Sequence, residues 1–505
     1  MLITFIHSEL QALGIEYLSA ILKAKGYRTE FVVDPCFQFL NKQGAILKFM
    51  MRLRKKIVQS VLDKNPAMVA FSVNARNGPW AQEMAREIKS LSDVPIVFGG
   101  IQPTLVPEAF LRDDAVDYVI RGEADLIFTE LIKRLEQNLP LDSVDGLVYK
   151  NKGRMVSNPL GVPISDLDAL PFADKDILPN WFNKKLYRII TSRGCPGQCT
   201  YCCAPIINKL YSANTSSIRR RSSGNVIREL EVARERFKIE RVFFEDDLFT
   251  FEYEWVEQFS LEYKRRINLP CLVHATLNTL TEPMIRLLER MQCVIVEVGV
   301  QSLNPVIRSD ILKRYYSNDQ IREVIKLLRQ HGICCLCDNI IGLPKQNEGD
   351  LVNMVKFYNE LRPGKIEILK LEYYPGAPIV KQAGLCEKKQ MALCQGRLIV
   401  ASQDNRHCIK MMQLIGLSYI MPRMLISFLL KYKLYRWFLP ISDVNHFNQL
   451  IYYCSAVFRK DRRKILIGLR LDVVHKFRYI MEKVFRNQKC KPDLHKKRRT
   501  LLLRG

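Results

Sequence analysis

The sequence TSRGCPGQCTYCCAP, residues 191–205, has four cysteines within nine positions and decides how the rest of the chain is interpreted. Cys195, Cys199 and Cys202 follow an apolar run and are spaced CxxxCxxC, so three thiolates on one compact loop can face one metal centre. Zinc prefers a fourth protein ligand, and no CxxC or HxxxH partner lies at a plausible distance. The spacing therefore favours a 4Fe-4S cluster whose fourth iron is left open to a substrate or cofactor.

The remaining cysteines indicate a reducing environment. Cys203 adjoins Cys202, and since adjacent side chains on an irregular loop rarely both reach one iron, we expect Cys203 to pack beside the cluster. The chain has 15 cysteines, an odd total without repeated spacing, which is poor material for a disulfide framework. The N-terminus lacks an export signal and no long apolar run free of charge occurs, so we expect a cytoplasmic protein without a membrane span.

The first 140 residues predict a parallel, doubly wound α/β sheet of the Rossmann-like kind, because short apolar runs alternate with helical patterns. Ligands bind such sheets beyond the carboxyl ends of the strands. Gly99, Gly100 and Gln102 in GGIQPT, together with GEAD at 122–125, occupy such ends and could let a flat ligand approach the backbone. Ordinary turns are the simpler interpretation of these loops.

Three further regions follow. Residues 141–182 are expected to be a linker, with a hairpin at Lys152-Gly153 and the extended segment ISDLDALPFADKDILP. Residues 183–385 contain six strand–helix units, which fit an open, partial (β/α)6 barrel of the TIM type better than a closed barrel of eight units. Residues 386–505 are expected to form a mainly helical, basic region.

From the cysteine loop through the strand ends that follow, the chain resembles the radical S-adenosylmethionine (SAM) superfamily, over most of residues 1–385. In that family SAM binds the open iron, and an electron from the cluster cleaves it to a 5′-deoxyadenosyl radical. The sequence EVGVQS followed by ILKRYYS resembles oxygen-independent coproporphyrinogen oxidase, where a Gln meets the ribose and an Arg the carboxylate. The resemblance implies a set of cofactor contacts: Tyr201, Glu245, Asp246, Gln301, Arg314 and Asp338, with Asp247 a further candidate in FFEDD. A solvated turn is the alternative for FFEDD.

The N-terminal sheet, GEAD and DLDALPF resemble the radical SAM subgroup that has a cobalamin-binding domain in front of the core. This resemblance implies cobalamin contacts at Gly99, Gly100 and Gln102. Gln102 stands where many relatives have the cobalt-ligating His of a DxHxxG motif, and His7 is the only histidine before residue 274. A cobalt without a histidine ligand would suit methyl transfer.

The resemblance implies an enzyme that uses a 4Fe-4S cluster, SAM and cobalamin to methylate an unactivated carbon of a small or lipophilic metabolite, with electrons from a ferredoxin or flavodoxin. Two alternatives stay open. One is a radical cyclase or rearrangement enzyme of the porphyrin-ring cyclase type, without net methyl transfer. The other is a non-catalytic regulator that binds iron–sulfur or cobalamin, which Gln301, Arg314 and Asp338 disfavour, because a mere cluster carrier needs no SAM site.

The C-terminal fifth carries most of the basic excess. Residues 401–505 contain 23 Lys and Arg against 6 Asp and Glu, within a chain of net charge +25. Large apolar residues stand beside these cations in MMQLIGLSYIMPRMLISFLLKYKLYRWFLPI, a mixture that suits either an interfacial helix on anionic lipid or a helical cap on the barrel. Nucleic acid ranks last, because no recognisable RNA-binding module accompanies the charge.

Overall fold

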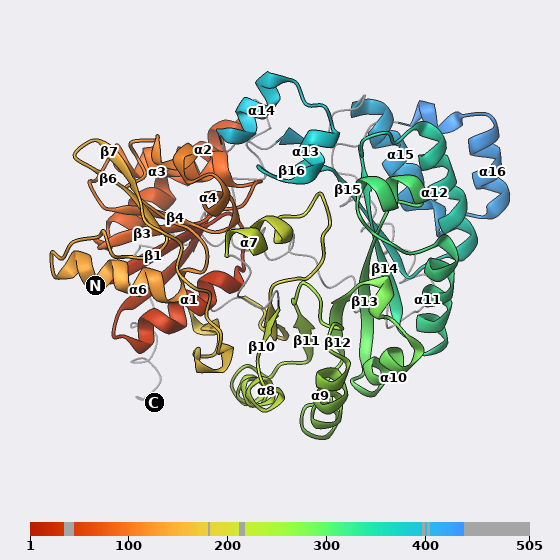
Figure 1. Ribbon diagram of the computed structural model, residues 1–505, viewed down its shortest axis with the longest axis horizontal. Helices are drawn as coiled ribbons and strands as arrows, with labels where there is room; N and C mark the ends of the chain where they lie inside the picture. Colours follow the sequence, from red (N-terminus) through yellow and green to blue (C-terminus); the bar gives the residue numbers. More distant parts are fainter. Residues whose placement is uncertain (35–44, 180–181, 212–217, 396–398, 401–404, 439–505) are drawn as a thin grey trace, which may run out of the picture.

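A seven-stranded sheet that is mainly parallel and a parallel six-stranded sheet make up the body of the protein, and the carboxyl ends of their parallel strands border one cavity. The computed structural model describes the chain except residues 35–44, 180–181, 212–217, 396–398, 401–404 and 439–505. The N-terminal sheet and its helices lie on the left of Figure 1, and the second sheet with its helices lies on the right. The cysteine loop and α7 (Ala204–Leu210) lie between the two.

The N-terminal sheet has the strand order β2-β1-β3-β4-β5-β6-β7, in which the first five strands are parallel. The parallel strands are β1 (Leu2–His7), β2 (Arg28–Val33), β3 (Met68–Ser72), β4 (Ile96–Gly99) and β5 (Tyr118–Ile120). This confirms the doubly wound sheet that the alternating pattern predicts. The alternation of strand side chains between two faces explains the two separate cores, one on each side.

Each face of this sheet is covered by its own helices. One core is closed by α1 (Leu13–Ala24) and α6 (Ala124–Glu136), and the other by α2 (Ala45–Leu62), α3 (Gly78–Lys89) and the short α5 (Pro107–Leu111). The short α4 (Ile101–Leu105) follows β4 directly. Helix α2 is not among the predicted elements, because its lysines and arginines interrupt the apolar pattern.

The hairpin expected at Lys152-Gly153 is present and belongs to the N-terminal sheet. Strands β6 (Leu147–Asn151) and β7 (Arg154–Ser157) are antiparallel, and β6 pairs with β5. Lys152 and Gly153 both have positive φ, as a two-residue hairpin turn requires. The sheet therefore continues past residue 140, into the range expected to be linker.

The second sheet is an open barrel of six parallel strands in the order β15-β14-β13-β12-β11-β8. Sequential strands are neighbours throughout, as the six expected strand–helix units predict. The strands are β8 (Leu186–Ile189), β11 (Arg241–Phe244), β12 (Cys271–Ala275), β13 (Cys293–Gln301), β14 (Cys334–Ile341) and β15 (Lys365–Lys370). The helices outside them are α8 (Ser223–Phe237), α9 (Tyr253–Arg266), α10 (Glu282–Arg290), α11 (Asn318–Gln330) and α12 (Glu348–Leu361).

Small elements complete the barrel. The two-residue strands β9 (Ser192–Arg193) and β10 (Arg219–Arg220) are antiparallel, and so are β16 (Glu372–Tyr373) and β17 (Ile399–Val400). A π-helical turn at Ile307–Ile311 follows β13, and α13 (Pro378–Gln382) and α14 (Glu387–Cys394) follow β16. After the hairpin, the described part of the linker contains two short 3-10 turns, Leu167–Ala169 and Lys175–Ile177.

The described part of the C-terminal region is helical, as expected. Helices α15 (Asn405–Ser418) and α16 (Arg423–Lys431) pack on α12, and Met411, Leu414 and Ile415 join the barrel core. This part therefore caps the barrel beyond β15. The basic tail, residues 439–505, lies outside the described residues. None of the helices in the described part of the chain has the length and hydrophobicity needed to cross a bilayer.

Candidate active site

The cysteine loop runs from β9 to α7 and brings its sulfurs together. A Cβ added to Gly197 would lie 3.3 Å from Cys195 Sγ and 3.8 Å from Cys199 Sγ, so the two sulfurs converge beside a residue that has no side chain. Thr200 anchors the loop to the barrel, because its Oγ1 donates a hydrogen bond of 2.5 Å to Ile311 O. The three expected ligands therefore lie on a loop of fixed shape.

Hydrogen bonds favour the thiolate form at Cys202. The N–H of Ala204, in the first turn of α7, donates to Cys202 Sγ at 3.5 Å. The neighbouring Cys203 thiol also donates to Cys202, which lowers the pKa of Cys202 to about 7 and raises that of Cys203. Cys203 thus hydrogen-bonds to an expected ligand, consistent with its expected place beside the cluster.

Tyr201 and Arg314 meet above this loop. Arg314 Nη1 donates to Cys199 Sγ at 3.3 Å and to Tyr201 Oη at 3.4 Å. Its Nη2 donates to Gly299 O at 2.8 Å, and its Nε donates to Tyr316 Oη at 2.9 Å. These bonds fix the guanidinium plane beside the cluster loop, where it can meet a carboxylate.

Gln301 and Asp338 lie next to Arg314 on neighbouring strands. A Cβ added to Gly299 would lie 2.5 Å from Gln301 Nε2 and 3.5 Å from Arg314 Nη2, so this glycine makes room for both polar groups. Gly299 pairs with Asp338 across β13 and β14, and Gln301, with φ of 62°, ends the strand at a register shift. The structure thus brings Gln301, Arg314 and Asp338 together around Gly299.

The three acidic residues of FFEDD, Glu245, Asp246 and Asp247, have different surroundings. Asp246 is fully buried and accepts hydrogen bonds from Thr191 N (3.1 Å), Thr191 Oγ1 (2.6 Å) and Ser192 Oγ. Asp246 therefore positions the strand before the cysteines. It is not among the residues that line the cavity between the two sheets, in contrast to the predicted cofactor contact. Glu245 forms a two-bond ion pair with Arg188, and Glu245 and Asp247 line this cavity.

That cavity, of about 440 Å³, lies where the two sheets meet. Its N-terminal wall contains four glycines, Gly14, Gly99, Gly100 and Gly122, together with aromatic residues such as Phe5 and Phe128. The barrel wall contains Ser192, Arg193 and Gly194, which directly precede Cys195. Gly100 has φ of +105° and its added Cβ would meet Val73 O at 2.6 Å, so no other residue fits there without strain.

Gln102 is not among the residues that line the cavity. It is buried, and its Oε1 would lie 3.1 Å from a Cβ added to Gly78 at the start of α3. The structure therefore does not support the predicted contact between Gln102 and cobalamin. Gly99 and Gly100, in contrast, do line the cavity. No histidine of the described residues lines it either.

Ion pairs hold the two halves together around this cavity. Arg193 and Arg219 on β9 and β10 pair with Asp125 and Glu123 of the GEAD sequence. In addition, the linker residue Lys175 forms a fully buried ion pair with Glu16 of α1 and donates to Arg188 O at 2.8 Å.

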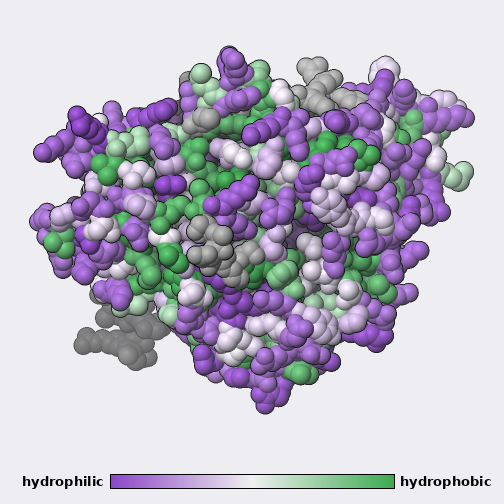
Figure 2. Space-filling model, viewed as in Figure 1, coloured by the Kyte–Doolittle hydropathy of each residue, from purple (hydrophilic) through white to green (hydrophobic). Residues whose placement is uncertain are grey.

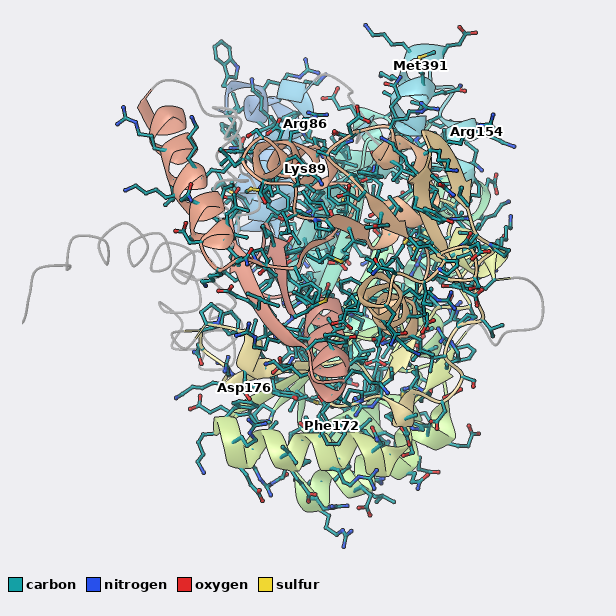
Figure 3. All side chains as sticks on the ribbon, turned by 90° about the vertical axis from the view of Figure 1, so that its left-hand side faces the viewer. Arg86, Lys89, Arg154, Phe172, Asp176 and Met391 are labelled. Atoms are coloured by element: carbon teal, nitrogen blue, oxygen red, sulfur yellow. The ribbon has the colours of Figure 1, made fainter. Side chains whose placement is uncertain are left out.

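Residues 172–176 of the linker contact both halves of the molecule. Figure 3 shows Phe172 and Asp176 of the linker next to the helices at the bottom of the view. Asp176 pairs with Arg236 of α8 at 2.5 Å, and the Arg221 guanidinium lies over the Phe172 ring at 5.8 Å. The extended segment predicted from its prolines and aspartates is thus a strap between the domains.

Sequence reasoning missed two carboxylates inside the barrel. Glu297 on β13 and Glu367 on β15 flank Asp338, and oxygens of the three side chains lie within 4.8 Å of one another. Side chains alternate between the two faces of a strand, so Glu297 and Glu367 lie on the same face as the predicted residues Gln301 and Asp338. This two-residue alternation is the sequence signal that could have found them.

The residues present fit the three expected cofactors. The cysteine loop offers three soft sulfur ligands, Arg314 offers a bidentate donor for a carboxylate, and the glycine-lined strand ends let a flat macrocycle approach the backbone. One cavity borders both the strand ends and the loop, so ligands at the two places would be neighbours.

Comparisons with known proteins agree with this geometry. Residues 189–358 match the model of the radical SAM superfamily, and residues 2–132 match that of the B12 binding domain. The chain is 27% identical over 327 residues to the uncharacterized methyltransferase PH0819 of Pyrococcus horikoshii, covering 63% of this chain and 70% of that protein. It is 22% identical to the anaerobic magnesium-protoporphyrin IX monomethyl ester cyclase of Rubrivivax gelatinosus, covering 76% and 70%.

Two solved structures share the fold over most of the chain. The cobalamin-dependent SAM radical enzyme OxsB superposes with a TM-score of 0.63 and 16% identity, covering 96% of this chain and 80% of that chain. The radical SAM methyltransferase TsrM from Kitasatospora setae gives a TM-score of 0.60 and 18% identity, covering 75% and 76%.

The fold and site define a class of enzyme in which a cysteine-bound iron–sulfur centre faces a cobalamin domain across one cavity. Within that class, the chain is a cobalamin-dependent radical SAM enzyme, and its cofactors are a 4Fe-4S cluster, SAM and cobalamin.

Proposed function

We propose that the protein is a methyltransferase that places a methyl group on an unactivated carbon of a small or lipophilic metabolite. The observation that carries the proposal is the single cavity bordered by Gly99 and Gly100 on one side and by Gly194, next to Cys195, on the other. When bound, the cluster and SAM supply a 5′-deoxyadenosyl radical and cobalamin supplies a methyl group. A shared cavity lets both reach one substrate carbon.

The protein's part is orientation and exclusion of water. Arg314 and Gln301 are proposed to hold the carboxylate and the ribose of SAM, with Asp338 as a second acceptor for ribose hydroxyls. Tyr201 is proposed to cover the cluster side. The apolar side chains of the cavity wall, such as Phe5 and Phe128, exclude water from the reacting atoms.

The similarity to the methyltransferases PH0819 and TsrM favours methyl transfer. Gly14, Gly99, Gly100 and Gly122 of the cavity wall would let cobalamin lie close to the backbone. The alternative is a radical cyclase, which the similarity to the Rubrivivax gelatinosus protein keeps in view.

Isotope transfer separates these proposals. The full chain is reconstituted anaerobically with iron, sulfide and hydroxocobalamin, then reduced and incubated with SAM that carries a deuterated methyl group. We expect deuterated methylcobalamin together with S-adenosylhomocysteine. A cyclase would give 5′-deoxyadenosine without S-adenosylhomocysteine, a regulator would give neither, and either result would contradict the proposal. Gly14→Trp, which would fill the cavity, is the matched control for the cobalamin-dependent product.

We propose two kinds of partner. The first is a reductant protein such as a ferredoxin or flavodoxin, which the one-electron reduction of the cluster requires. The second is an anionic membrane surface, which would bring a cytoplasmic enzyme to a lipophilic substrate. Nucleic acid is not proposed.

A surface on α16 supports the membrane partner. Met424, Phe428 and Tyr432 recur every four residues, so they form one stripe on the outer face of the helix, and Met424 is 86% exposed. Trp437 follows with 84% exposure. Figure 2 shows hydrophilic and hydrophobic residues intermixed over the face in view. An apolar stripe of this size on a helix whose inner face is already packed fits an apolar environment.

Cations surround the stripe. Arg423, Lys431 and Lys433 flank it, whereas Arg436 pairs with Glu348 at 3.1 Å. The groove beside the stripe is lined by Val352, Ile426 and Leu430 together with Lys356 and Glu360. Anionic headgroups would meet these cations while acyl chains meet the stripe.

Vesicle co-sedimentation tests this contact. We expect the full chain to bind vesicles containing phosphatidylglycerol and not vesicles of phosphatidylcholine alone. Met424→Ser with Phe428→Ser should weaken binding by roughly tenfold or more, because two large apolar side chains are lost. Leu91→Ser with Leu261→Ser removes two exposed leucines elsewhere and should have no effect. Equal binding by all three proteins would overturn the membrane proposal.

A further inference from the structure

The GEAD sequence, residues 122–125, carries an ion-pair network that ties the cobalamin domain to the cysteine loop. Arg193 donates from Nη1 to Asp125 Oδ2 at 2.8 Å and from Nη2 to Asp125 Oδ1 at 2.9 Å. Asp125 is 5% exposed, so this two-bond pair is shielded from solvent. Arg193 stands two residues before Cys195.

A second pair repeats the arrangement on the adjacent strand. Arg219 faces Arg193 in the β9–β10 register and donates two hydrogen bonds to the Glu123 carboxylate, one of them 3.0 Å long. Glu123 also lies 3.5 Å from Arg193 Nη1. Two arginines of the barrel thus meet two carboxylates at the start of α6, where the helix N-terminus also favours negative charge.

The backbone of GEAD is shaped for this contact. Gly122 has φ of +80°, and a Cβ there would lie 2.0 Å from Tyr211 Oη. Tyr211 Oη in turn accepts the N–H of Glu123 at 2.8 Å. The tight turn at Gly122 therefore places Glu123, Asp125 and Tyr211 close together.

The strand before the cysteines is held from two directions. On the barrel side Asp246 accepts hydrogen bonds from Thr191 and Ser192. On the cobalamin side Asp125 holds Arg193, the next residue. Both carboxylates are buried, and the loop that bears Cys195 starts directly after this clamped segment.

We infer that Asp125 is a positioning residue which, through Arg193, fixes the distance between the cluster loop and the cobalamin cavity. The inference rests on the proposed function in one respect, because both cofactors must meet at this cavity. It goes beyond that function by assigning the GEAD sequence to the coupling of the two cofactors, and it does not depend on the substrate.

The first test uses the cofactor-free protein. Asp125→Asn keeps the side-chain volume and removes the charge, and we expect hydrogen exchange of the amides in residues 190–199 to become roughly tenfold faster, the order that loss of one charge-assisted hydrogen bond implies. Asp125→Glu keeps the charge and should restore slower exchange. Asp114→Asn breaks an exposed ion pair with Lys150 in the same domain and should leave these amides unchanged.

The second test measures the distance itself. In the fully loaded enzyme, the reduced cluster and cob(II)alamin are both paramagnetic, so each should speed the spin relaxation of the other. We expect this enhancement in the wild-type protein and in Asp114→Asn, and a weaker or broadened enhancement in Asp125→Asn at unchanged iron and cobalamin content. Unchanged exchange and unchanged enhancement in Asp125→Asn would overturn the inference. No enhancement in the wild-type protein would instead contradict the proposed meeting of the cofactors.

Discussion

Arg314 donates a hydrogen bond from Nη1 to Cys199 Sγ over 3.3 Å, although 115 positions separate the two residues. Burial by itself would lower the pKa of Arg314, but the neighbouring Tyr316, Tyr201 and Cys199 raise it above its ordinary value. The guanidinium is therefore a permanent positive charge between the cluster loop and the end of β13. We therefore expect Arg314 to meet the carboxylate of SAM beside the cysteine loop.

Arg314→Lys should weaken SAM binding by roughly tenfold to a hundredfold, because an ammonium cannot keep the bonds to Gly299 and Tyr316 and also pair bidentately with a carboxylate. Iron content should not change. Equilibrium dialysis with labelled SAM measures the effect, and Arg322→Lys on the surface of α11 is the control. Wild-type affinity in Arg314→Lys would remove Arg314 from the SAM site.

Single replacements divide the four clustered cysteines into two groups. Cys195→Ala, Cys199→Ala and Cys202→Ala should each lose the iron–sulfur absorbance, because three thiolates hold the cluster. Cys203→Ala should keep it, since Cys203 only donates a hydrogen bond to Cys202. Iron and sulfide analysis after anaerobic reconstitution decides the matter. Iron loss in Cys203→Ala equal to that in the others would contradict the assignment.

Gly14 offers a way to block the cavity without disturbing the fold. It lies in α1, lines the cavity and has no atom within 4 Å of an added Cβ. Gly14→Ala should stabilise the protein by about 0.5–1 kcal/mol, because alanine is the better helix former. Gly14→Trp should abolish hydroxocobalamin binding in a spectroscopic titration, whereas Gly224→Trp, also in open space but on α8, should not. Full binding by Gly14→Trp would place cobalamin elsewhere.

Asp247 should make the cofactor-free protein less stable as pH rises. Burial raises the pKa of its carboxyl above the ordinary value of 3.8, Asp246 raises it further and His274 opposes the rise. The folded state therefore holds this proton more tightly than the unfolded state, and ionisation above the ordinary pKa costs stability. Asp247→Asn should raise the melting temperature at about pH 8 and have a smaller effect as the pH falls towards about 4.

Asp114 is the control for that prediction, because Lys150 lowers its pKa. Ionisation of Asp114 therefore stabilises the folded protein as pH rises, opposite to the effect of Asp247. Asp114→Asn should not raise the melting temperature at high pH. An equal rise in both variants, or a gain in Asp247→Asn that grows towards low pH, would contradict the account of Asp247.

The fold was largely predictable because its signals are local. Apolar runs such as RVFF and CLVHA alternate with amphipathic helices, and sequential strands of a parallel sheet are usually neighbours. The hairpin at Lys152-Gly153 was also predictable, but its pairing with β5 was not, because no short-range pattern specifies an antiparallel addition to a parallel sheet. Helix α2 was missed for a similar reason, since its basic residues obscure the apolar face.

At the three cysteines, residue type and spacing both carry chemistry, and the structure places them on one loop beside Gly197; their role as cluster ligands stays a prediction. Asp246 and Gln102 show the limit of this reasoning. A carboxylate after a strand can face a ligand or hold its neighbours, and only the bonds from Thr191 and Ser192 distinguish the two. The pairing of Asp125 with Arg193 joins two domains and leaves no periodic signal in either one.

The most direct test of the central claim is the product analysis of the reconstituted enzyme. The full chain, loaded with cluster and cobalamin, is reduced anaerobically and supplied with SAM, and the products are identified by mass spectrometry. We predict both 5′-deoxyadenosine and S-adenosylhomocysteine from the wild-type protein, and neither from the variant in which Cys195, Cys199 and Cys202 are all alanine. A wild-type protein with a full cluster and bound SAM that forms no 5′-deoxyadenosine would contradict the claim.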